Sequence, residues 1–292
     1  MIILLFESDT WLGRKLYSLF SLVGKVYCAK SCMENRQDVL NEILSIRPNY
    51  VIVSVEGKHG TDWYEWNRQT AVQVCVLGVL NVIDVCNMLS IHCTYFSSGM
   101  IYQNCEASEE DPPNFFDSVY SNMQIMTENI IKETYLSNTL VLRIRMPISH
   151  DYHPDNLIFK LLRYEKLINV ANSVTVLDDM LPLSLDLITN NIKGIYNFVN
   201  PGVITHNEIM DIVKEYVDPE ITYENFSVEE QNKILLCPRS NATLCIFKLQ
   251  DTLESLYPGR EVYIPPVGVS VENCLKRLKV EENKTVSSCI LI

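Results

Sequence analysis

The sequence predicts an α/β fold in which a doubly wound parallel sheet carries a smaller C-terminal lobe. Two observations favour this architecture. Residues 1–147 alternate short apolar runs with amphipathic stretches, which is the pattern of β-α-β units over a parallel sheet. After Pro147 this pattern gives way to short segments and a proline-rich stretch, which indicates a separate and partly discontinuous lobe.

The elements of the first half follow from their local patterns. Ile2–Phe6 is apolar but short, lacks a basic leader and runs into Glu7, so it is expected to be a buried strand and not a signal peptide. Asp38–Ile46 has apolar residues at helical spacing, and Gln69–Leu89 is a long apolar helix. The predicted order is strand Ile2–Phe6, helix Trp11–Leu22, strand Lys25–Ala29, helix Asp38–Ile46, strand Tyr50–Val55, helix Gln69–Leu89, strand Cys93–Ser97, helix Val119–Leu136 and strand Leu140–Ile144. This order is typical of a Rossmann-like dinucleotide-binding domain, here expected over residues 1–147.

Residues 148–279 are expected to form a substrate-binding lobe. Its predicted segments are Lys166–Val170, Gly194–Phe198, a helix His206–Val217, Glu229–Leu235 and the proline-rich Tyr257–Pro266. Residues 280–292 are polar until the last four and are expected to be a flexible tail.

The amino-acid composition argues against several classes of function. The 292 residues have 47% hydrophobic content and a net charge of −12, which argues against a nucleic-acid surface or a polybasic membrane patch. The ten cysteines form no CxxC pair, so reduced cysteines in a cytoplasmic protein are expected, with no disulfide or zinc site. No uninterrupted apolar segment reaches the ~18 residues of a membrane-spanning helix.

Tyr120-Ser-Asn-Met-Gln124 is the most informative stretch for chemistry. In short-chain dehydrogenases, a helical Tyr is followed four residues later by a Lys on the same face, and the cation lowers the phenol pKa. An unperturbed Tyr titrates near ~10 and needs such a neighbour at neutral pH. Gln124 can form hydrogen bonds but carries no charge.

Several blocks together resemble one family. They are Leu142–Ser149, Asn172–Asp179, Asn197–Glu208, Asn225–Gln231 and Pro238–Asn241. These blocks resemble the bifunctional UDP-4-keto-6-deoxyglucose 3,5-epimerase/4-reductases of UDP-rhamnose synthesis, which are relatives of dTDP-4-dehydrorhamnose reductase among the extended short-chain dehydrogenases. The resemblance runs from residue 1 to about 250 and implies an NADP(H) cofactor and a UDP- or dTDP-linked 6-deoxyhexose as ligand.

The cofactor loop departs from the family pattern. The family reads Gly-x-x-Gly-Trp-x-Gly where this chain has Glu7-Ser-Asp-Thr10-Trp11-Leu12-Gly13. The first glycine permits a tight turn, and the second lets backbone amides approach the pyrophosphate. Glu7 would also place a carboxylate near the phosphates. We therefore expect Trp11, Leu12 and Gly13 to be what remains of a cofactor site whose binding is weakened; a remodelled loop that still binds NADP is the alternative.

The resemblance assigns further roles residue by residue. Ser98 falls at the family's hydroxyl partner of the substrate carbonyl, and Lys160 matches its second epimerisation residue. Met100 replaces the proposed epimerisation Cys, and Cys75 replaces an Asn of the proton relay. Tyr120 with Ser98 could be a functional pair of hydroxyls or could merely line an old pocket.

The second half implies a sugar-nucleotide pocket. Arg143, Arg145, Arg163 and Arg239 could donate to a diphosphate, and each could equally be structural. Asn200-Pro-Gly202 predicts a turn that presents Thr205, His206, Asn207 and Glu208, while Asp178 and Asp179 lie in a segment that shapes the family's substrate site. Lys30 and Arg36 follow the second strand, which favours NADP over NAD if they are more than solvated charges.

Cys289-Ile-Leu-Ile292 fits the CaaX prenylation pattern, although its final Ile is atypical and an accidental apolar tail would look the same. One prenyl chain without basic support would give only weak membrane attachment.

Three functional hypotheses follow. The first is a sugar-nucleotide-related pseudoenzyme that binds a sugar nucleotide or a protein partner. The second is a working NADP-dependent 4-keto-sugar-nucleotide reductase/epimerase with substitute residues. The third is a structural interaction module that is tethered to a membrane only if Cys289 is prenylated. The long helices Gln69–Leu89 and Val119–Leu136 could form a homodimer interface or could equally just cover the sheet.

Overall fold

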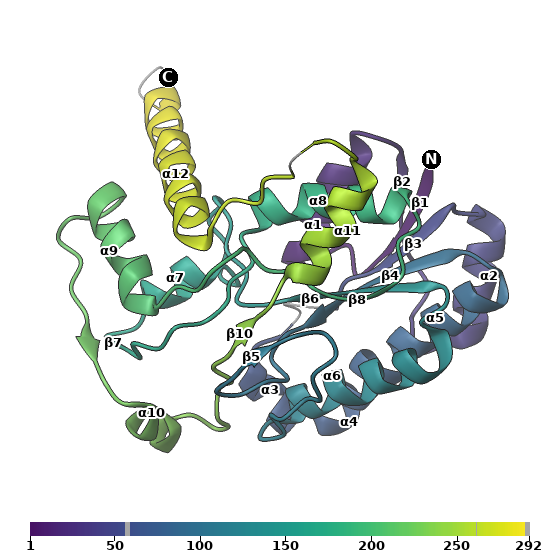
Figure 1. The fold of residues 1–292 in the computed structure, drawn as a ribbon, viewed down its shortest axis with the longest axis horizontal. Helices are drawn as coiled ribbons and strands as arrows, with labels where there is room; N and C mark the ends of the chain where they lie inside the picture. The colour runs from purple at the N-terminus through teal and green to yellow at the C-terminus, as the bar shows by residue number, and fades with distance from the viewer. Residues whose placement is uncertain (56–58, 261, 290–292) are drawn as a thin grey trace.

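A six-stranded parallel sheet forms the centre of the molecule (Figure 1). The computed structural model describes the backbone of residues 1–55, 59–260 and 262–289, and side chains as far as residue 278. The strand order is β2 (Lys25–Cys28), β1 (Ile2–Phe6), β3 (Tyr50–Val53), β4 (His92–Ser98), β6 (Thr139–Ile144) and β8 (Gly194–Asn197). All neighbouring strands are parallel. Because the chain reverses its direction of travel across the sheet between β1 and β3, a crevice for a ligand is expected at the carboxyl ends of these strands. The predicted doubly wound α/β fold is confirmed.

Helices cover both faces of the sheet. Alternate residues of β1 show the division: Ile3 and Leu5 pack into one buried cluster, and Leu4 and Phe6 into another. The first cluster includes α1 (Trp11–Ser21), α8 (Leu177–Thr189) and α11 (Phe247–Leu256). The second includes α2 (Arg36–Ile46), α4 (Arg68–Val72), α5 (Val79–Met88) and α6 (Val119–Ile130).

Two π-helical segments interrupt the long helices of the second face. Segment η1 (Gln73–Gly78) joins α4 to α5, and η2 (Ile131–Tyr135) continues α6. The run Arg68–Met88 is long and apolar enough to cross a membrane by length and composition, yet 56% of it is buried inside the molecule. Since it packs on the sheet, its apolar character is that expected of a core helix.

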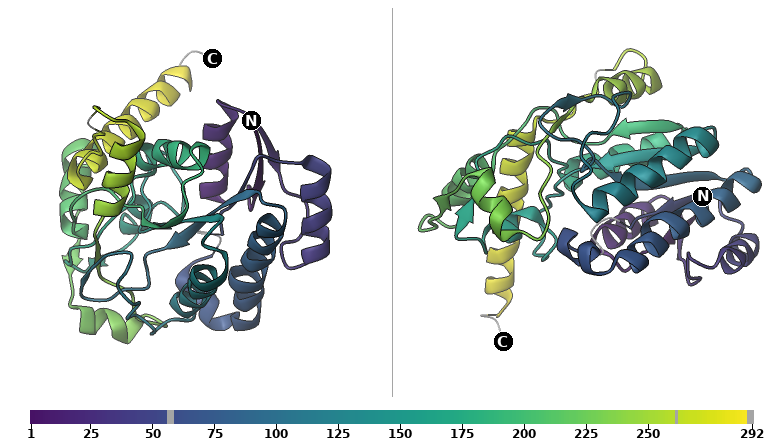
Figure 2. Two further views of the ribbon diagram at one scale, coloured as in Figure 1. Left: turned by 45° about the vertical axis from the view of Figure 1, so that its right-hand side comes forward. Right: turned by 90° about the horizontal axis from the view of Figure 1, so that it is seen from below.

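The C-terminal lobe has its own buried cluster. The lobe comprises α7 (Leu157–Leu161), β7 (Lys166–Leu167), α9 (His206–Tyr216), β9 (Glu224–Asn225), α10 (Val228–Ile234) and α12 (Val267–Cys289). Its buried cluster includes residues of α7, β7, α9 and α12. Two further short strands, β5 (Glu106–Ala107) and β10 (Thr243–Leu244), pair with each other beside the main sheet. Helix α12 packs against α9 and then projects away from the sheet (Figures 1 and 2).

The predicted extent of the lobe needs correction. Gly194–Phe198 was assigned to the lobe, but β8 is the sixth strand of the main sheet, and α8 and α11 also pack on that sheet. The lobe of 148–279 is thus interrupted by a return of the chain to the first domain. Helix α12 continues through residues 280–289, and the Ile290–Ile292 part of the prenylation motif lies outside the described residues. Within the predicted segment Lys166–Val170, the first two residues form strand β7.

The nine cysteines whose side chains the structure describes are all free, and five of them are buried. In the same part, no group of three or more His, Cys, Asp or Glu side chains is placed to hold a metal ion.

Candidate active site

Helix α6 carries Tyr120, Gln124 and Glu128 on one buried face toward the sheet. Ser118 starts the helix, because its hydroxyl accepts the backbone N–H of Ser121 at 3.1 Å. Residues four apart lie above one another on a helix, so these three side chains form a row. The predicted pair Tyr120 and Gln124 therefore shares one face, as the family pattern requires.

The amide of Gln124 is tied to strand β4. Its Oε1 accepts the Tyr95 hydroxyl at 2.7 Å and the Ser97 hydroxyl at 3.3 Å. Gln124 Nε2 is buried without a hydrogen-bond partner among the described residues. A neutral amide fixed by two hydroxyls thus occupies the position where the family has its lysine cation, and it supplies no charge that would lower the pKa of Tyr120.

Arg143, predicted to bind substrate, is instead part of the core. Its Nε donates to both carboxylate oxygens of Glu128 at 3.1 Å, and its Nη1 donates to Asn197 Oδ1 at 3.3 Å. Burial opposes the charge of Arg143, but attraction to Glu128 outweighs it and raises the pKa of the guanidinium. Burial also raises the pKa of Glu109, whose carboxylate accepts the backbone N–H of Asn197 at 2.8 Å. The prediction for Arg143 is corrected: its donors are used inside the protein.

Arg145 is likewise structural. Its Nη1 donates to Ser240 Oγ at 2.9 Å and to the Gly99 carbonyl at 3.2 Å, while Nη2 donates to Asn172 Oδ1 at 2.6 Å. Burial lowers the pKa of Arg145 to about 10. The Arg145 side chain joins three of the sequence blocks that carry the family resemblance. Part of that resemblance is therefore explained by an internal hydrogen-bond network and not by a ligand-binding surface.

The other two predicted arginines remain nearer the surface. Arg163 is exposed, just after α7. Arg239 is half-buried and its Nη2 lies 2.9 Å from Asp62 Oδ1 on helix α3 (Thr61–Trp66). Lys160, predicted for epimerisation, is half-exposed and lies 3.9 Å from Asp155. The structure does not bring Lys160 into the Gln124 network.

The predicted turn before α9 is confirmed. Gly202 has φ +84°, and Thr205 forms a reciprocal capping box with Glu208. His206 follows the cap, and burial lowers its pKa to about 4. Asn207, predicted to bind substrate, exchanges two hydrogen bonds with Asn225 at 2.9 and 2.8 Å. This amide pair ties α9 to β9 and uses the polar atoms that a ligand would need.

Ser98 lies buried at the carboxyl end of β4, where its hydroxyl accepts the Met100 amide at 3.3 Å. The Met100 side chain packs against the cluster that contains Tyr95 and Tyr120, so it serves as apolar packing. Cys75 is buried in η1, and its carbonyl accepts the Thr127 hydroxyl of α6 at 2.8 Å. Met100 and Cys75 stand where the resemblance implies Cys and Asn, so these two side chains lack the chemistry that it implies, while Ser98 keeps its hydroxyl.

The loop after β1 keeps a tight turn without its first glycine. Glu7 has φ +57°, in the left-handed region that glycine favours, at a cost of about 1–2 kcal/mol for other residues. The Glu7 carbonyl accepts the Thr10 amide at 3.2 Å and the Thr10 hydroxyl at 2.9 Å. A tight turn therefore forms here without the glycine, because hydrogen bonds from Thr10 hold the Glu7 carbonyl.

Thr10 also uses one of the helix amides that a diphosphate would bind. Its Oγ1 accepts the Gly13 amide at 3.0 Å and caps α1. Gly13 itself is required, since a Cβ there would lie 2.3 Å from the Glu7 carbonyl oxygen. In glycine-rich loops the amides at this helix terminus face the pyrophosphate. With a side chain at residue 10 and an anion at residue 7, the loop does not fit a dinucleotide diphosphate as it stands.

A strap missed by the sequence reasoning covers the start of α1. Trp11 and Leu12, predicted for cofactor binding, are buried, and Trp11 Nε1 donates to Asp151 Oδ2 at 2.9 Å. Lys15 Nζ lies 2.9 Å from Asp151, and the His153 ring stacks on Trp11 with centroids 5.4 Å apart. Hydrogen bonds outweigh burial and lower the pKa of Asp151. No motif marks these residues, because single His and Asp residues are common on surfaces.

The end of β2 does not favour a 2′-phosphate. Lys30 is exposed, and its backbone amide donates to Glu42 Oε1 at 2.9 Å, while the Ser31 amide donates to Glu42 Oε2 at 2.8 Å. Burial acts to raise the pKa of Glu42, but the hydrogen bonds from Ser31 and Lys30 outweigh it and lower the pKa. An ionised carboxylate therefore sits beside Lys30 and opposes the predicted preference for NADP. Arg36 pairs with Asp84.

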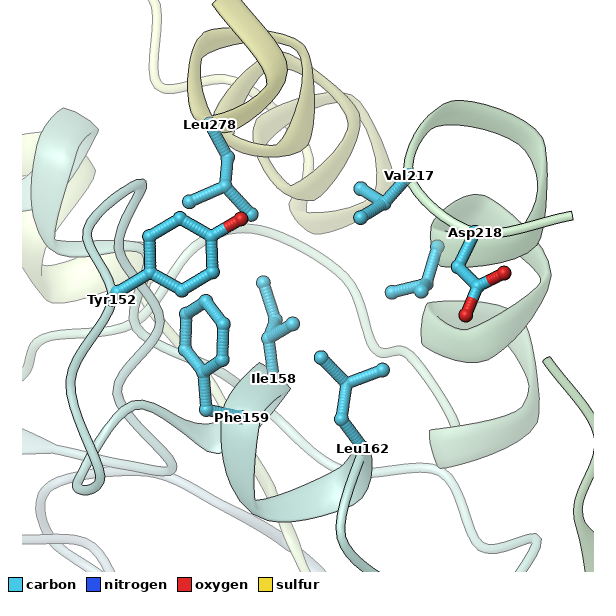
Figure 3. Close-up of a pocket in the computed structure, with 8 residues that line it drawn as sticks. Tyr152, Ile158, Phe159, Leu162, Val217, Asp218 and Leu278 are labelled. Atoms are coloured by element: carbon cyan, nitrogen blue, oxygen red, sulfur yellow. The ribbon is translucent and has the colours of Figure 1, made fainter. Parts of the chain in front are cut away.

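Two hollows lie apart from the Tyr120 network. One, of about 330 Å³, is apolar and lies between α7, α9 and α12, with Phe159, Leu162 and Leu278 in its wall (Figure 3). The other, of about 460 Å³, lies between α1 and α8 beside the strap. Of the predicted catalytic, cofactor and arginine residues, only Trp11 lines either described hollow.

The sequence and the fold were compared with those of known proteins. No protein-family model matches the chain. A bifunctional dTDP-4-dehydrorhamnose 3,5-epimerase/dTDP-4-dehydrorhamnose reductase of Arabidopsis thaliana is 35% identical over 274 residues, which cover 89% of this chain and 90% of that protein. A trifunctional UDP-glucose 4,6-dehydratase/UDP-4-keto-6-deoxy-D-glucose 3,5-epimerase/UDP-4-keto-L-rhamnose-reductase of the same plant is 37% identical over 89% of this chain. The chain spans only 41% of the length of that trifunctional relative.

Solved structures that match this fold have the same kind of names as the sequence relatives. The L780 UDP-rhamnose synthase of Acanthamoeba polyphaga mimivirus superposes with a TM-score of 0.85 and 30% identity, covering 95% of this chain and 99% of that one. The dTDP-4-dehydrorhamnose reductase of Bacillus anthracis in complex with NADP has a TM-score of 0.79 over 94% of this chain and 98% of that one; at 17% identity it shows the fold alone. The chain belongs to the UDP-rhamnose synthase and dTDP-4-dehydrorhamnose reductase-like family of extended short-chain dehydrogenases/reductases.

Proposed function

We propose that this family member binds a UDP- or dTDP-linked 6-deoxyhexose and acts as a binding or regulatory protein whose NADP-dependent catalysis is lost or strongly impaired. The observation that carries the proposal is the loop after β1. There the Thr10 hydroxyl accepts the Gly13 amide, and residue 7 is a glutamate where the family has its first glycine. A like charge ~5 Å from a phosphate costs a few kcal/mol at an effective dielectric of ~20, which is a large part of the binding free energy of a cofactor.

The Tyr120 site supports the same conclusion independently. Gln124 is buried, uncharged and held by Tyr95 and Ser97, so it can neither lower the Tyr120 pKa as a cation nor move freely toward a ribose. Met100 supplies no titratable proton for epimerisation. Reduction and epimerisation thus each lack a group that the family pattern supplies.

The runner-up is an active NADP-dependent 4-keto-6-deoxy-sugar-nucleotide 3,5-epimerase/4-reductase. Two observations favour it: the Glu7 turn keeps the left-handed backbone of a glycine loop, and the mimiviral UDP-rhamnose synthase is similar over almost the whole chain. Tyr120 and Ser98 are also retained.

Binding and turnover measured together separate the two functions. Calorimetric titration of the purified chain with UDP-glucose and with NADPH is expected to show heat for the first ligand only. NADPH oxidation with UDP-4-keto-6-deoxyglucose is expected to be absent. The double variant Glu7→Gly/Thr10→Gly is expected to gain NADPH binding, while Thr10→Ser, which keeps the hydroxyl, is not. NADPH binding and turnover by the unaltered chain would overturn the proposal and establish the runner-up.

A further inference from the structure

Helix α3 links the C-terminal lobe to the candidate active site. At its start, Asp62 Oδ1 lies 2.9 Å from Arg239 Nη2 and accepts a weak hydrogen bond from Cys237 Sγ at 3.7 Å. At its end, Glu65 Oε1 accepts the backbone amide of Val119, the first residue of α6, at 2.6 Å. A short helix is thus attached by one carboxylate to the lobe and by another to the helix of Tyr120.

Between these two attachments, Tyr64 packs directly on Tyr120. Their ring centroids are 5.0 Å apart with planes tilted by 44°, and Tyr64 is buried. Trp63 meets the Tyr64 ring edge-on with centroids 5.2 Å apart, so it backs Tyr64 on another side. Aromatic pairs of this geometry are favourable beyond the area they bury. The position of α3 therefore determines whether the Tyr64 ring packs on the Tyr120 ring.

Arg239 differs from the buried arginines in how firmly it is held. Its backbone neighbours are anchored, because Ser240 and Asn241 bond to Arg145, Asn172 and Gln103. Its side chain keeps one internal partner, Cys237, whose carbonyl accepts Nη1 at 2.8 Å, and one ionic partner, Asp62. Asp62 is 44% exposed and Arg239 25% exposed, so solvent and ligands can reach this ion pair.

An exposed carboxylate is a weak competitor for a guanidinium. Ion pairs of this kind contribute little to stability, whereas a diphosphate carries more charge and accepts bidentate hydrogen bonds from Arg. An incoming diphosphate at Arg239 would therefore displace Asp62, and the freed carboxylate would be repelled by the ligand. Loss of this contact removes the restraint that ties the start of α3 to the lobe.

We propose that Asp62 and Tyr64 are positioning residues: a diphosphate-bearing ligand that reaches Arg239 displaces Asp62 and shifts α3, which changes the packing of Tyr64 on Tyr120. The inference rests on the proposed binding of a sugar nucleotide and on Arg239 as a donor to its diphosphate, and it adds helix α3 as the element that responds to the ligand. In the unliganded protein, Asp62 holds that arginine and Tyr64 covers the Tyr120 ring.

Tryptophan fluorescence can report the shift, because two of the three tryptophans, Trp63 and Trp66, lie on α3. The probes are UDP and UDP-glucose, with uridine as the control that lacks the diphosphate. UDP is expected to change the emission of the unaltered chain and uridine is not. The change is expected to disappear in Trp63→Phe/Trp66→Phe while UDP binding measured by calorimetry persists.

Asp62→Asn tests the competition. This nearly isosteric change removes the ionic competitor, so UDP is expected to bind about fivefold more tightly, with a smaller emission change because α3 is already released. Arg239→Gln is expected to bind UDP at least tenfold more weakly. Asp38→Asn, an acid on α2 away from this contact, is the matched control and is expected to bind like the unaltered chain.

The outcomes separate this inference from the proposed function. If UDP binds but Asp62→Asn binds it no more tightly, or if the emission of α3 does not respond, the inference is wrong and the proposed binding function stands. If neither the unaltered chain nor Asp62→Asn binds UDP or UDP-glucose, both are wrong. Thermal melting of Asp62→Asn and Arg239→Gln checks that each variant is folded.

Discussion

Replacing Arg143 by methionine distinguishes a core arginine from a ligand-binding one. Arg143 and Glu128 are almost fully buried, with side chains 2% and 6% exposed, and every nitrogen of the guanidinium has an internal partner. Removing Arg143 would leave the Glu128 carboxylate buried with only a distant Ser97 hydroxyl, at 3.4 Å. Breaking one side of such a pair typically costs ~3–5 kcal/mol, because the remaining charge is not solvated.

The assay is urea-induced unfolding followed by circular dichroism, with the midpoint and slope compared among variants. Arg143→Met is expected to lose ~3–5 kcal/mol of the free energy of unfolding, and the double variant Arg143→Met/Glu128→Met should recover most of that loss because no charge is stranded. Exposed Arg163→Met is the control and should stay within ~0.5 kcal/mol of the unaltered chain. An Arg143→Met protein with unchanged stability but lost UDP-glucose binding would refute the structural assignment and restore Arg143 as a ligand donor.

Four further outcomes follow from the loop and from α9. Glu7→Gly should leave stability unchanged or raise it by up to ~1 kcal/mol, because it relieves a left-handed backbone, whereas Glu254→Gly within α11 should cost ~1 kcal/mol; urea midpoints compare the two. Thr10→Val should cost ~1 kcal/mol through loss of the helix cap, measured in the same way. Gly13→Ala should cost ~1–3 kcal/mol or prevent soluble expression, and a normal melting curve would contradict the close approach to the Glu7 carbonyl. Because burial lowers the pKa of His206 to about 4, below its unfolded value near ~6.5, the unfolded chain binds more protons between these limits, so stability should fall as pH drops from ~6.5 toward 4. Urea midpoints at two pH values in His206→Gln should show a smaller fall than in the unaltered chain; an equal fall would rule His206 out as the cause.

The sheet was predictable because its strands are local apolar runs. Five of the six strands were placed within two residues, since continuous burial leaves a continuous hydrophobic signal. Strand β8 was also found as a segment, but its pairing with β6 was not, because Gly194–Asn197 lies about fifty residues farther along and the pattern does not name a partner.

The candidate site was harder to predict, since side-chain roles depend on burial. A sequence shows that Arg143 and Arg145 are charged, but their burial against Glu128, Asn172 and Ser240 exists only in the folded chain. The strap of Asp151 and His153 over Trp11 gave no signal, because neither residue belongs to a spaced motif. The absence of a cation at Gln124, by contrast, could be read directly, since helical spacing fixes which face a residue shares.

The backbone of the Glu7 turn has a practical consequence for how relatives of this chain are recognised. A search for the glycine motif in the sequence would miss this loop, whereas a superposition of backbones would match it. The backbone keeps a tight turn after β1, although glycine is absent from positions 7 and 10. Proteins of this kind will therefore be under-counted wherever membership is judged by consensus glycines.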